Sequence, residues 1–208
     1  MKQIMHKIEP LFSIPLYSAM LDRNLTEQEN VFVAQQTGNV VKNRGGNYMS
    51  FNNNILESKE LEELHGFFLE HINNYFNQIV NTNNKITPYI TQSWLNYNNK
   101  NTFHHVHSHP NSYISGVFYI DSNIDNDSIE FMIDDHAITF SEIKDFNMYN
   151  STHWTIPVTT GKLLLFPSNL RHCVKNHTQD YLRISLSFNV FVKGTIGSNL
   201  TQLKIMEG

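Results

Sequence analysis

The sequence predicts a mainly β domain with helical cover (α+β), arranged as a closed barrel or as two packed sheets. From Ser58 onward, apolar residues recur every three or four positions, which is the spacing of one helix face. After Pro88 the chain changes to short runs rich in β-branched and aromatic residues, with turn residues between them. One long helix followed by many short strands favours a β fold that is closed or double-layered.

Length and composition predict a single domain. The chain has 208 residues, of which 40 % are hydrophobic and 12 % aromatic, and this is enough for one hydrophobic core. We expect residues 1–88 to supply an opening strand and the covering helices, residues 89–195 to form the β core, and residues 196–208 to be a C-terminal tail.

Charge and cysteine content exclude several classes of protein. The net charge is −4 at pH 7 and no run of Lys or Arg occurs, so nothing predicts nucleic-acid binding. No apolar stretch approaches the roughly 18 residues that span a bilayer, and Glu9 with two prolines interrupts any signal-peptide core. A single cysteine, Cys173, excludes an internal disulfide and a multi-cysteine metal site, so we expect a cytoplasmic protein.

The predicted helix begins near Ser58, a candidate N-cap followed by glutamates that suit the positive end of the helix dipole. It should end before the N-T-N-N stretch at 81–84. We expect it to cover a sheet, with His65 and His71 at the surface or edge. Its apolar face consists of Leu61, Leu64, Phe67, Phe68, Ile72, Tyr75, Phe76 and Ile79.

Six strands are predicted after this helix. They are Ile90–Tyr97, Tyr113–Ile120, Ser128–Ile133, His153–Val158, Lys162–Phe166 and Tyr181–Val192. The polar segment 121–150 is expected to form a hairpin and a long loop, a place where substrate contacts often lie.

The last strand carries a strict alternation of side chains. Leu182, Ile184, Leu186, Phe188 and Val190 point to one face, and Arg183, Ser185, Ser187 and Asn189 point to the other. The polar face is either a wet sheet surface or the lining of a barrel, where an arginine needs an anionic partner.

Four of the eleven histidines lie within six residues, H-H-V-H-S-H at 104–109. Because residues two apart on a strand share a face, His105, His107 and His109 are expected to project together, with His104 opposite. Imidazole suits iron, zinc, nickel or copper, and two such histidines with a third from a distant strand could hold one face of an octahedral metal. A pairing of His105 with His107, or a His-rich surface loop without a metal, are the alternatives.

A second signal lies near the other end of the chain. His172 follows the turn P-S-N-L-R, and Arg183 comes eleven residues later on the polar face of the last strand. A metal and an arginine placed in this way can hold a small dicarboxylate, with one end on the metal and the other in a bidentate salt bridge.

Several motifs in order resemble a family of 2-oxoglutarate- and iron-dependent oxygenases found in bacteria and marine phages. They are W-L-N at 94–96, H-S-H-P-N-S at 107–112, S-G-V-F-Y-I at 115–120, G-K-L-L-L-F-P-S-N-L-R-H at 161–172 and R-I-S-L-S-F-N at 183–189. The resemblance covers about half the chain, and extends weakly to P-L-F-S-I-P-L at the N-terminus. It implies a double-stranded β-helix (jelly-roll or cupin-like barrel), and the host cytoplasm if the chain is phage-encoded.

The resemblance also implies roles for single residues. His107 and His172 match the first and last metal ligands, Arg183 and Ser185 match the pair that holds the distal carboxylate of 2-oxoglutarate, Tyr119 resembles a tyrosine that shares this carboxylate, and Asn96 is assigned to the chelating end. The chain departs from the wider superfamily at the middle ligand, because His109 stands where a carboxylate is usual. A three-histidine site leaves the metal one charge more positive.

The implied activity is that of a dioxygenase that uses Fe(II) and 2-oxoglutarate. Oxidative decarboxylation of 2-oxoglutarate would be coupled to C–H oxidation, with His107, His109 and His172 as the catalytic metal ligands. The expected substrate is an unidentified small molecule or protein side chain. A homodimer is compatible with the sequence.

Two rival interpretations come from other classes. In zinc-dependent isopeptidases with His-x-His-Pro, six residues separate the proline from a serine, and an aspartate follows three later; here four residues separate Pro110 from Ser115, and Phe118 takes the aspartate's place. The second rival is a metal- or ligand-binding β-barrel without catalysis. Cys173 is expected to be a buried thiol that faces away from the metal, and His136, His153 and His177 to be loop residues, with His153 at the edge of the substrate pocket.

Overall fold

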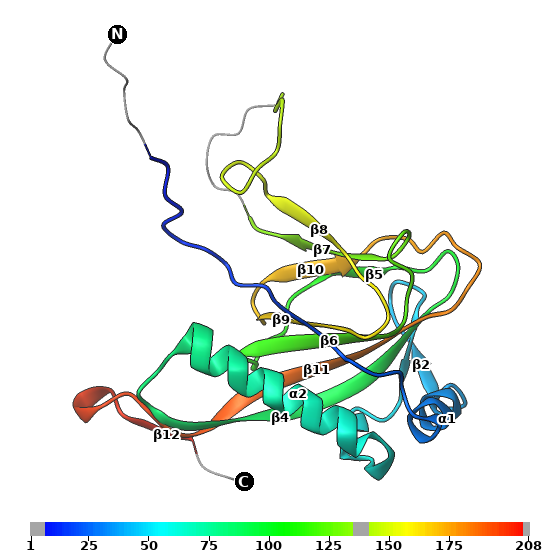
Figure 1. Ribbon diagram of the computed structural model, residues 1–208, viewed down its shortest axis with the longest axis horizontal. Helices are drawn as coiled ribbons and strands as arrows, with labels where there is room; N and C mark the ends of the chain where they lie inside the picture. Colours follow the sequence, from blue (N-terminus) through cyan, green and yellow to red (C-terminus); the bar gives the residue numbers. More distant parts are fainter. Residues whose placement is uncertain (1–6, 135–141, 206–208) are drawn as a thin grey trace.

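Two antiparallel sheets face each other in the computed structural model, which describes residues 7–134 and 142–205 (Figure 1). The larger sheet has the order β1 (Tyr17–Met20), β9 (Lys162–Pro167), β6 (Ile114–Asp121), β11 (Arg183–Ile196), β4 (Lys85–Asn98), β3 (Tyr48–Ser50) and β2 (Val40–Lys42), and β12 (Leu203–Ile205) pairs with β11. The smaller sheet has the order β5 (His104–His107), β10 (Arg171–Val174), β7 (Ser128–Met132) and β8 (His153–Pro157). The mainly β fold with helical cover is confirmed.

The six strands predicted after Pro88 are confirmed as β4, β6, β7, β8, β9 and β11, with ends that shift by a few residues. The opening strand of the domain is β1. The prediction of a tail over 196–208 was wrong for Leu203–Ile205, because the chain reverses at Gly197, whose φ is +75°, and returns as β12 through the short 3-10 turn η4 (Asn199–Thr201). His136 lies outside the described residues.

Helix α2 (Glu62–Tyr75) is the predicted covering helix, and it continues as a π-helical turn, η3 (Phe76–Val80). It ends as expected, at Asn81 with φ +45°. Ser58 is not its N-cap, because two 3-10 turns, η1 (Ile55–Glu57) and η2 (Lys59–Leu61), precede the helix, and the Ser58 side chain makes no capping hydrogen bond. The structure corrects this prediction.

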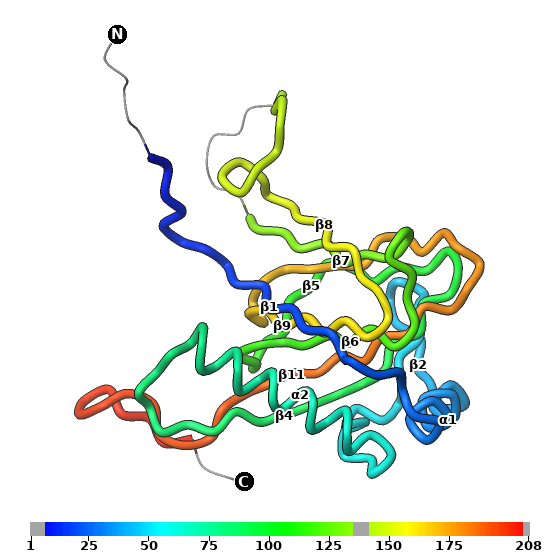
Figure 2. Tube along the Cα trace, in the orientation of Figure 1, coloured from blue at the N-terminus to red at the C-terminus, as the bar shows by residue number. Residues whose placement is uncertain are grey.

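Helix α2 crosses the outer face of the larger sheet (Figures 1 and 2). Phe68 packs with its ring centroid 5.0 Å from Phe188 on β11 and 5.3 Å from Phe118 on β6. A Cβ at Gly116, beside them on β6, would collide with the Phe188 ring, so only glycine allows this close approach. The main hydrophobic core therefore lies between helix and sheet, and leaves the space between the two sheets for other side chains.

Helix α1 (Glu27–Gln36) was not predicted from the sequence. Its N-terminus is closed by a capping box, in which Thr26 and Glu29 each bond the other's backbone N–H. Its apolar residues, Val31 to Val33, are adjacent instead of three or four apart, so the periodicity gave no signal. The T-E-Q-E capping pattern could have revealed it.

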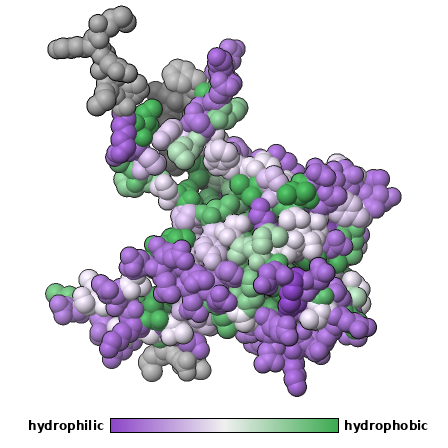
Figure 3. All heavy atoms as spheres, in the orientation of Figure 1, coloured by the Kyte–Doolittle hydropathy of each residue, from purple (hydrophilic) through white to green (hydrophobic). Residues whose placement is uncertain are grey.

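Apolar side chains gather where the N-terminal segment passes the β7–β8 hairpin (Figure 3). Leu11 and Phe12 of this segment are 79 % and 96 % exposed, and Trp154 on β8 is half exposed. Within the described ranges, no helix is long and apolar enough to cross a membrane.

Candidate metal centre

Strands β5 and β10 pair so that His107 lies directly opposite His172. His109 follows β5 in a turn, where its backbone N–H donates to the carbonyl of Ser168 over 2.8 Å. The ligand atoms of His107, His109 and His172 all lie within 4.8 Å of one another. The three histidines predicted as ligands are therefore brought together, although the first and last are far apart in the chain.

The position of the other clustered histidines differs from the prediction. Between the pairs His172/His107 and Val174/His104 the register of β5 and β10 shifts, because β5 contains one extra residue. This bulge turns His104 to the same side as His107, with the two rings stacked at 4.4 Å, and His104 lines the internal cavity. The predicted alternation therefore holds for His107 and His109 and fails at His104 and His105. His105 does not line the cavity, and the metal cluster does not contain the alternative pair of His105 with His107.

In each histidine of the cluster, an oxygen acceptor faces Nδ1. The Nδ1–H of His107 donates to the His105 carbonyl over 2.8 Å, and that of His172 donates to the Leu170 carbonyl over 2.9 Å. His109 Nδ1 lies 2.6 Å from Oδ1 of Asn189. With the proton on Nδ1, each Nε2 keeps its lone pair free for a metal.

Asn189 connects His109 to a chain of hydroxyl groups. Its Oδ1 also accepts from Ser115 Oγ over 3.0 Å, and Ser115 Oγ lies 2.8 Å from Ser168 Oγ. Ser168 in turn donates to Ser112 over 2.8 Å. His109, which belongs to no strand, is thereby fixed to β11, β6 and the turn after β9.

Burial keeps these imidazoles neutral. Loss of solvent, followed by repulsion from the neighbouring rings, lowers the pKa of His172 to about 3 and that of His107 to about 4. Burial also lowers the pKa of His109, against the hydrogen bond that its Nδ1–H donates to Asn189, which raises it. Neutral imidazole is the form that binds a metal, so protons compete weakly for this site.

One internal cavity between the sheets is lined by all seven predicted site residues: Asn96, His107, His109, Tyr119, His172, Arg183 and Ser185. Ser185 on β11 pairs with Asn96 on β4 and with Tyr119 on β6, so these three form one rung across the larger sheet. The polar face of the last strand therefore lines the inside of the barrel.

The polar atoms of this cavity fit a charged ligand, because several of them have no partner. Among the described residues that line it, Asn96 Oδ1, His109 Nε2 and Tyr119 Oη are buried without a hydrogen bond, and the Nε of Arg183 faces only the Asp127 carboxylate, at 3.8 Å. Such atoms are costly in a folded protein unless a ligand or water completes them. A metal fits His109 Nε2, and a small anion fits Arg183 and Tyr119.

Arg183 is buried at the start of β11, six residues before Asn189, which bonds His109. Its Nη2 donates to the Ser128 carbonyl over 3.3 Å, and its guanidinium carbon lies 5.3 Å from the Tyr119 ring centroid. Burial raises the pKa of Tyr119 to about 12, against the positive charge of Arg183, so the phenol stays a proton donor. Asp127, which the sequence analysis did not single out, lies 3.8 Å from Arg183 Nε.

A wider opening leads from the histidines to the surface. It shares Trp94, His104, His107 and His109 with the internal cavity. Its other walls are uncharged: Met49, Thr91, Gln92, Ser108, Pro110, Asn111 and Asn189. Trp94 stacks on His109 with ring centroids 5.7 Å apart, so the indole stands beside the cluster.

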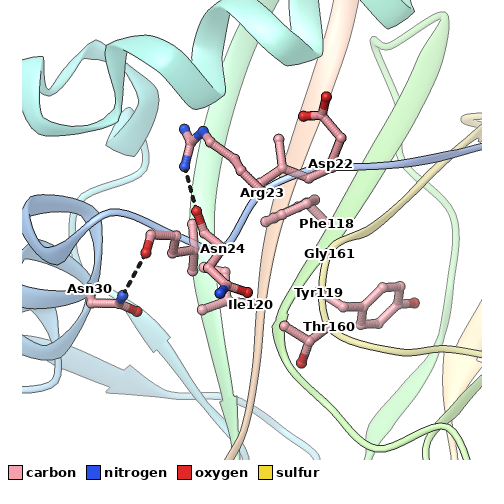
Figure 4. Close-up of a pocket in the computed structure, with 11 residues that line it drawn as sticks. Asp22, Arg23, Asn24, Asn30, Phe118, Tyr119, Ile120, Thr160 and Gly161 are labelled. Atoms are coloured by element: carbon pink, nitrogen blue, oxygen red, sulfur yellow. Dashed lines mark hydrogen bonds between the residues drawn. The ribbon is translucent and has the colours of Figure 1, made fainter.

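Another pocket, outside the barrel, has a different character (Figure 4). Its one arginine, Arg23, is already paired with Glu29 at 2.7 Å and Glu63 at 3.0 Å. The described histidines lie elsewhere, and its positive charge is neutralised. This pocket therefore does not fit a metal or a small dicarboxylate.

Residues 92–189 match the family described as "Putative 2OG-Fe(II) oxygenase". They contain all seven predicted site residues. This stretch is 98 of the 208 residues, just under half of the chain, and it is similar to the family. Proteins of this family use Fe(II) and 2-oxoglutarate. No curated protein matches the chain.

Solved 2OG-Fe(II) oxygenases share the fold at low sequence identity. An oxidoreductase of this family from Burkholderia pseudomallei has 13 % identity and a TM-score of 0.54, with 83 % of each chain covered. HygX from Streptomyces hygroscopicus, with nickel, 2-oxoglutarate and hygromycin B bound, has 11 % identity and a TM-score of 0.57 over 85 % of this chain and 82 % of its own. A prolyl-4-hydroxylase from Pseudomonas putida has 10 % identity and a TM-score of 0.56 over 85 % and 93 %. The double-stranded β-helix is thereby confirmed.

The cysteine and the remaining described histidines of the sequence predictions lie outside the metal cluster. Cys173 is buried as expected, and its Sγ contacts Glu130 at 3.7 Å, outside the metal cluster. His71 is half-buried and bonds Tyr17 over 2.7 Å. His177 is a loop residue as expected, and it is buried with its Nδ1 3.4 Å from Asp127 Oδ1, a contact that the sequence did not predict. Phe118 lies in the core under α2, and the zinc-hydrolase rival therefore has no third ligand there.

Proposed function

We propose that the chain binds Fe(II) through His107, His109 and His172 and hydroxylates an uncharged polar substrate. One observation carries this proposal: His172 from a distant strand meets His107 and His109, with one ligand atom of each ring within 4.8 Å of the others, and each ring is oriented by an oxygen at its Nδ1. A surface cluster of histidines would lack these anchors. Three neutral ligands leave positions for a cosubstrate on the metal.

We assign 2-oxoglutarate to the cavity between the histidines and Arg183. The guanidinium would hold the distal carboxylate, and Ser185 and Tyr119 would donate hydrogen bonds to it. Asn96 lies on the same rung, with its Nδ2 bonded to Ser187 over 3.0 Å and its Oδ1 unpartnered. It is thereby available to the chelating end.

The iron supplies the redox chemistry when it is bound, coupling decarboxylation of 2-oxoglutarate to oxidation of a C–H bond. The protein's residues bind, orient and exclude water. Phe166 and Phe131 pack on His172, with ring centroids at 4.8 Å and 6.1 Å, and would exclude water from that side of the site.

The substrate would enter through the opening beside Trp94. Gln92, Asn111 and Asn189 offer amide groups there, and Trp94 offers a flat apolar surface. No lysine, arginine or carboxylate is among the described residues that line it. This lining favours a neutral compound that carries hydroxyl or amide groups.

A cytoplasmic location is inferred from the single, buried cysteine.

The test is succinate formation from 2-oxoglutarate by the iron-loaded protein in air, together with calorimetric binding of 2-oxoglutarate to the nickel-loaded protein. Binding and turnover are expected. Binding without turnover, across neutral polar compounds offered as substrate, would favour the non-catalytic β-barrel. A protein that binds neither metal nor 2-oxoglutarate at millimolar concentration would contradict both.

A further inference from the structure

A second buried cluster lies behind Arg183. Asp127, His177 and Arg183 are 4 %, 5 % and 3 % exposed. Asp127 Oδ1 lies 3.4 Å from His177 Nδ1 and 3.8 Å from Arg183 Nε. A buried carboxylate between two such groups is costly unless it is held in place and paired.

Hydrogen bonds to the other oxygen fix this carboxylate. Asp127 Oδ2 accepts from the Tyr181 hydroxyl over 2.7 Å and from the backbone N–H of Asn123 over 2.8 Å. His177 Nε2 donates to the carbonyl of Tyr181 over 2.9 Å, which also orients that ring. Oδ1 is therefore left to face Arg183 and His177.

Three loops meet at this cluster. Asp127 comes from the loop before β7, and His177 and Tyr181 come from the loop between β10 and β11. The backbone of His177 exchanges hydrogen bonds with Thr102 and Asn101 in the loop between β4 and β5. The loops next to Arg183 are thus joined by hydrogen bonds, several of which involve Asp127 or His177.

We propose that Asp127 is a positioning residue, which holds the Nε side of Arg183 and directs the rest of the guanidinium at the distal carboxylate of 2-oxoglutarate. The proposal rests on the proposed function. An arginine has five N–H donors. Asp127 and the Ser128 carbonyl face two of them, one on Nε and one on Nη2, and so the remainder of the fork is left for a ligand.

This role differs from general stabilisation, because it acts on one end of the cosubstrate. 2-Oxobutanoate has the same chelating oxo acid as 2-oxoglutarate and lacks the distal carboxylate. If Asp127 orients Arg183, its loss weakens 2-oxoglutarate alone. If Asp127 supports the fold in general, both oxo acids and the metal are affected together.

The experiment measures the dissociation constants of Ni(II), and of 2-oxoglutarate and 2-oxobutanoate on the nickel-loaded protein, by calorimetry. Asp127→Asn keeps the shape and removes the charge. We expect 2-oxoglutarate to bind roughly tenfold more weakly, as for outer partners of other ligand sites, with 2-oxobutanoate and Ni(II) within about twofold of the wild type. Asp125→Asn, an exposed aspartate two residues away, is the matched control and should change none of the three.

Tyr181→Phe tests the same idea without altering the charge, since it removes one hydrogen bond to Asp127. It should weaken 2-oxoglutarate by about threefold, and it decides the question if Asp127→Asn does not fold. Equal losses for both oxo acids, unchanged binding, or tighter 2-oxoglutarate binding in the variant that folds would overturn the proposal. If the wild type does not prefer 2-oxoglutarate to 2-oxobutanoate, the proposed function itself fails, and the role of Asp127 fails with it.

Discussion

The two faces of β11 have different roles: one packs against helix α2, and the other lines the cavity and its opening. Toward α2 the strand presents Leu186, Phe188 and Val190, all fully buried among apolar side chains. Toward the smaller sheet it presents Arg183, Ser185, Ser187 and Asn189, which line the cavity or its opening. Because successive side chains alternate, stability and ligand binding are separated by a single step along the strand. Substitutions at adjacent residues should therefore change different measurements.

The largest effect is expected on the helix-facing side. Phe188→Ala removes a ring stacked on Phe68 and leaves a cavity, so the free energy of unfolding should fall by about 4 kcal/mol. Urea unfolding measures this loss, and the Ni(II) affinity of the folded fraction should be unchanged. A loss below about 1 kcal/mol would show that the packing of α2 does not carry the fold.

His172→Gln should have the next largest effect, and on the opposite measurement. Removal of one of three ligands should weaken Ni(II) binding at least a hundredfold, which corresponds to about 3 kcal/mol. The matched control is His153→Gln on β8, an exposed histidine outside the cluster. If both variants bind Ni(II) like the wild type, the cluster is not the metal site.

Acid should destabilise the metal-free protein. The pKa of His172 is about 3 and that of His107 about 4 in the folded chain, below the roughly 6.5 of an unfolded histidine. The stabilising contribution is therefore complete above about pH 6.5 and is lost as the pH falls toward the folded values. For each such histidine, the free energy of unfolding should fall by up to about 2 kcal/mol between pH 7 and pH 5. Thermal unfolding of the chelated protein measures the slope, and His172→Gln should make it shallower; an unchanged slope would mean that His172 titrates normally.

The smallest effect should come from Asn189, which bonds the candidate ligand His109 and is not itself a candidate ligand. Asn189→Ala removes the acceptor at His109 Nδ1 and should weaken Ni(II) binding about tenfold, or roughly 1.4 kcal/mol. Ser187→Ala, two residues earlier on the same face, is the control and should leave Ni(II) binding unchanged. A larger effect for Ser187 than for Asn189 would contradict the role of the hydrogen-bonded chain.

Alternation and motif order together predicted much of the site. The polar side of β11 and the rung of Asn96, Ser185 and Tyr119 follow from the two-residue period of strands, which holds along most of this sheet. The period failed at His104 and His105, where a bulge adds one residue to β5. A bulge depends on pairing with a distant strand, so no pattern in the local sequence could predict it.

Asp127 and His177 were missed for a related reason. Each lies in a polar loop with no periodic pattern, and its contacts are with other loops that are distant in the sequence. Helix α1 was missed although its Thr26–Glu29 capping box is readable in the sequence. The N-cap at Ser58 was wrong because tight 3-10 turns precede α2, and these depend on contacts such as the Leu56 N–H with Ser93.

The pairing of β4 with β11 has a consequence for the order of events during folding. These strands form the longest ladder of the sheet, from Asn98 opposite Arg183 to Lys85 opposite Thr195. A growing chain cannot complete that ladder until Thr195 has left the ribosome, and β6 and β12 pair with β11 as well. Contacts so distant in sequence form slowly. The metal centre, which needs Asn189 of β11 to hold His109, should therefore form only once β11 has paired with β4.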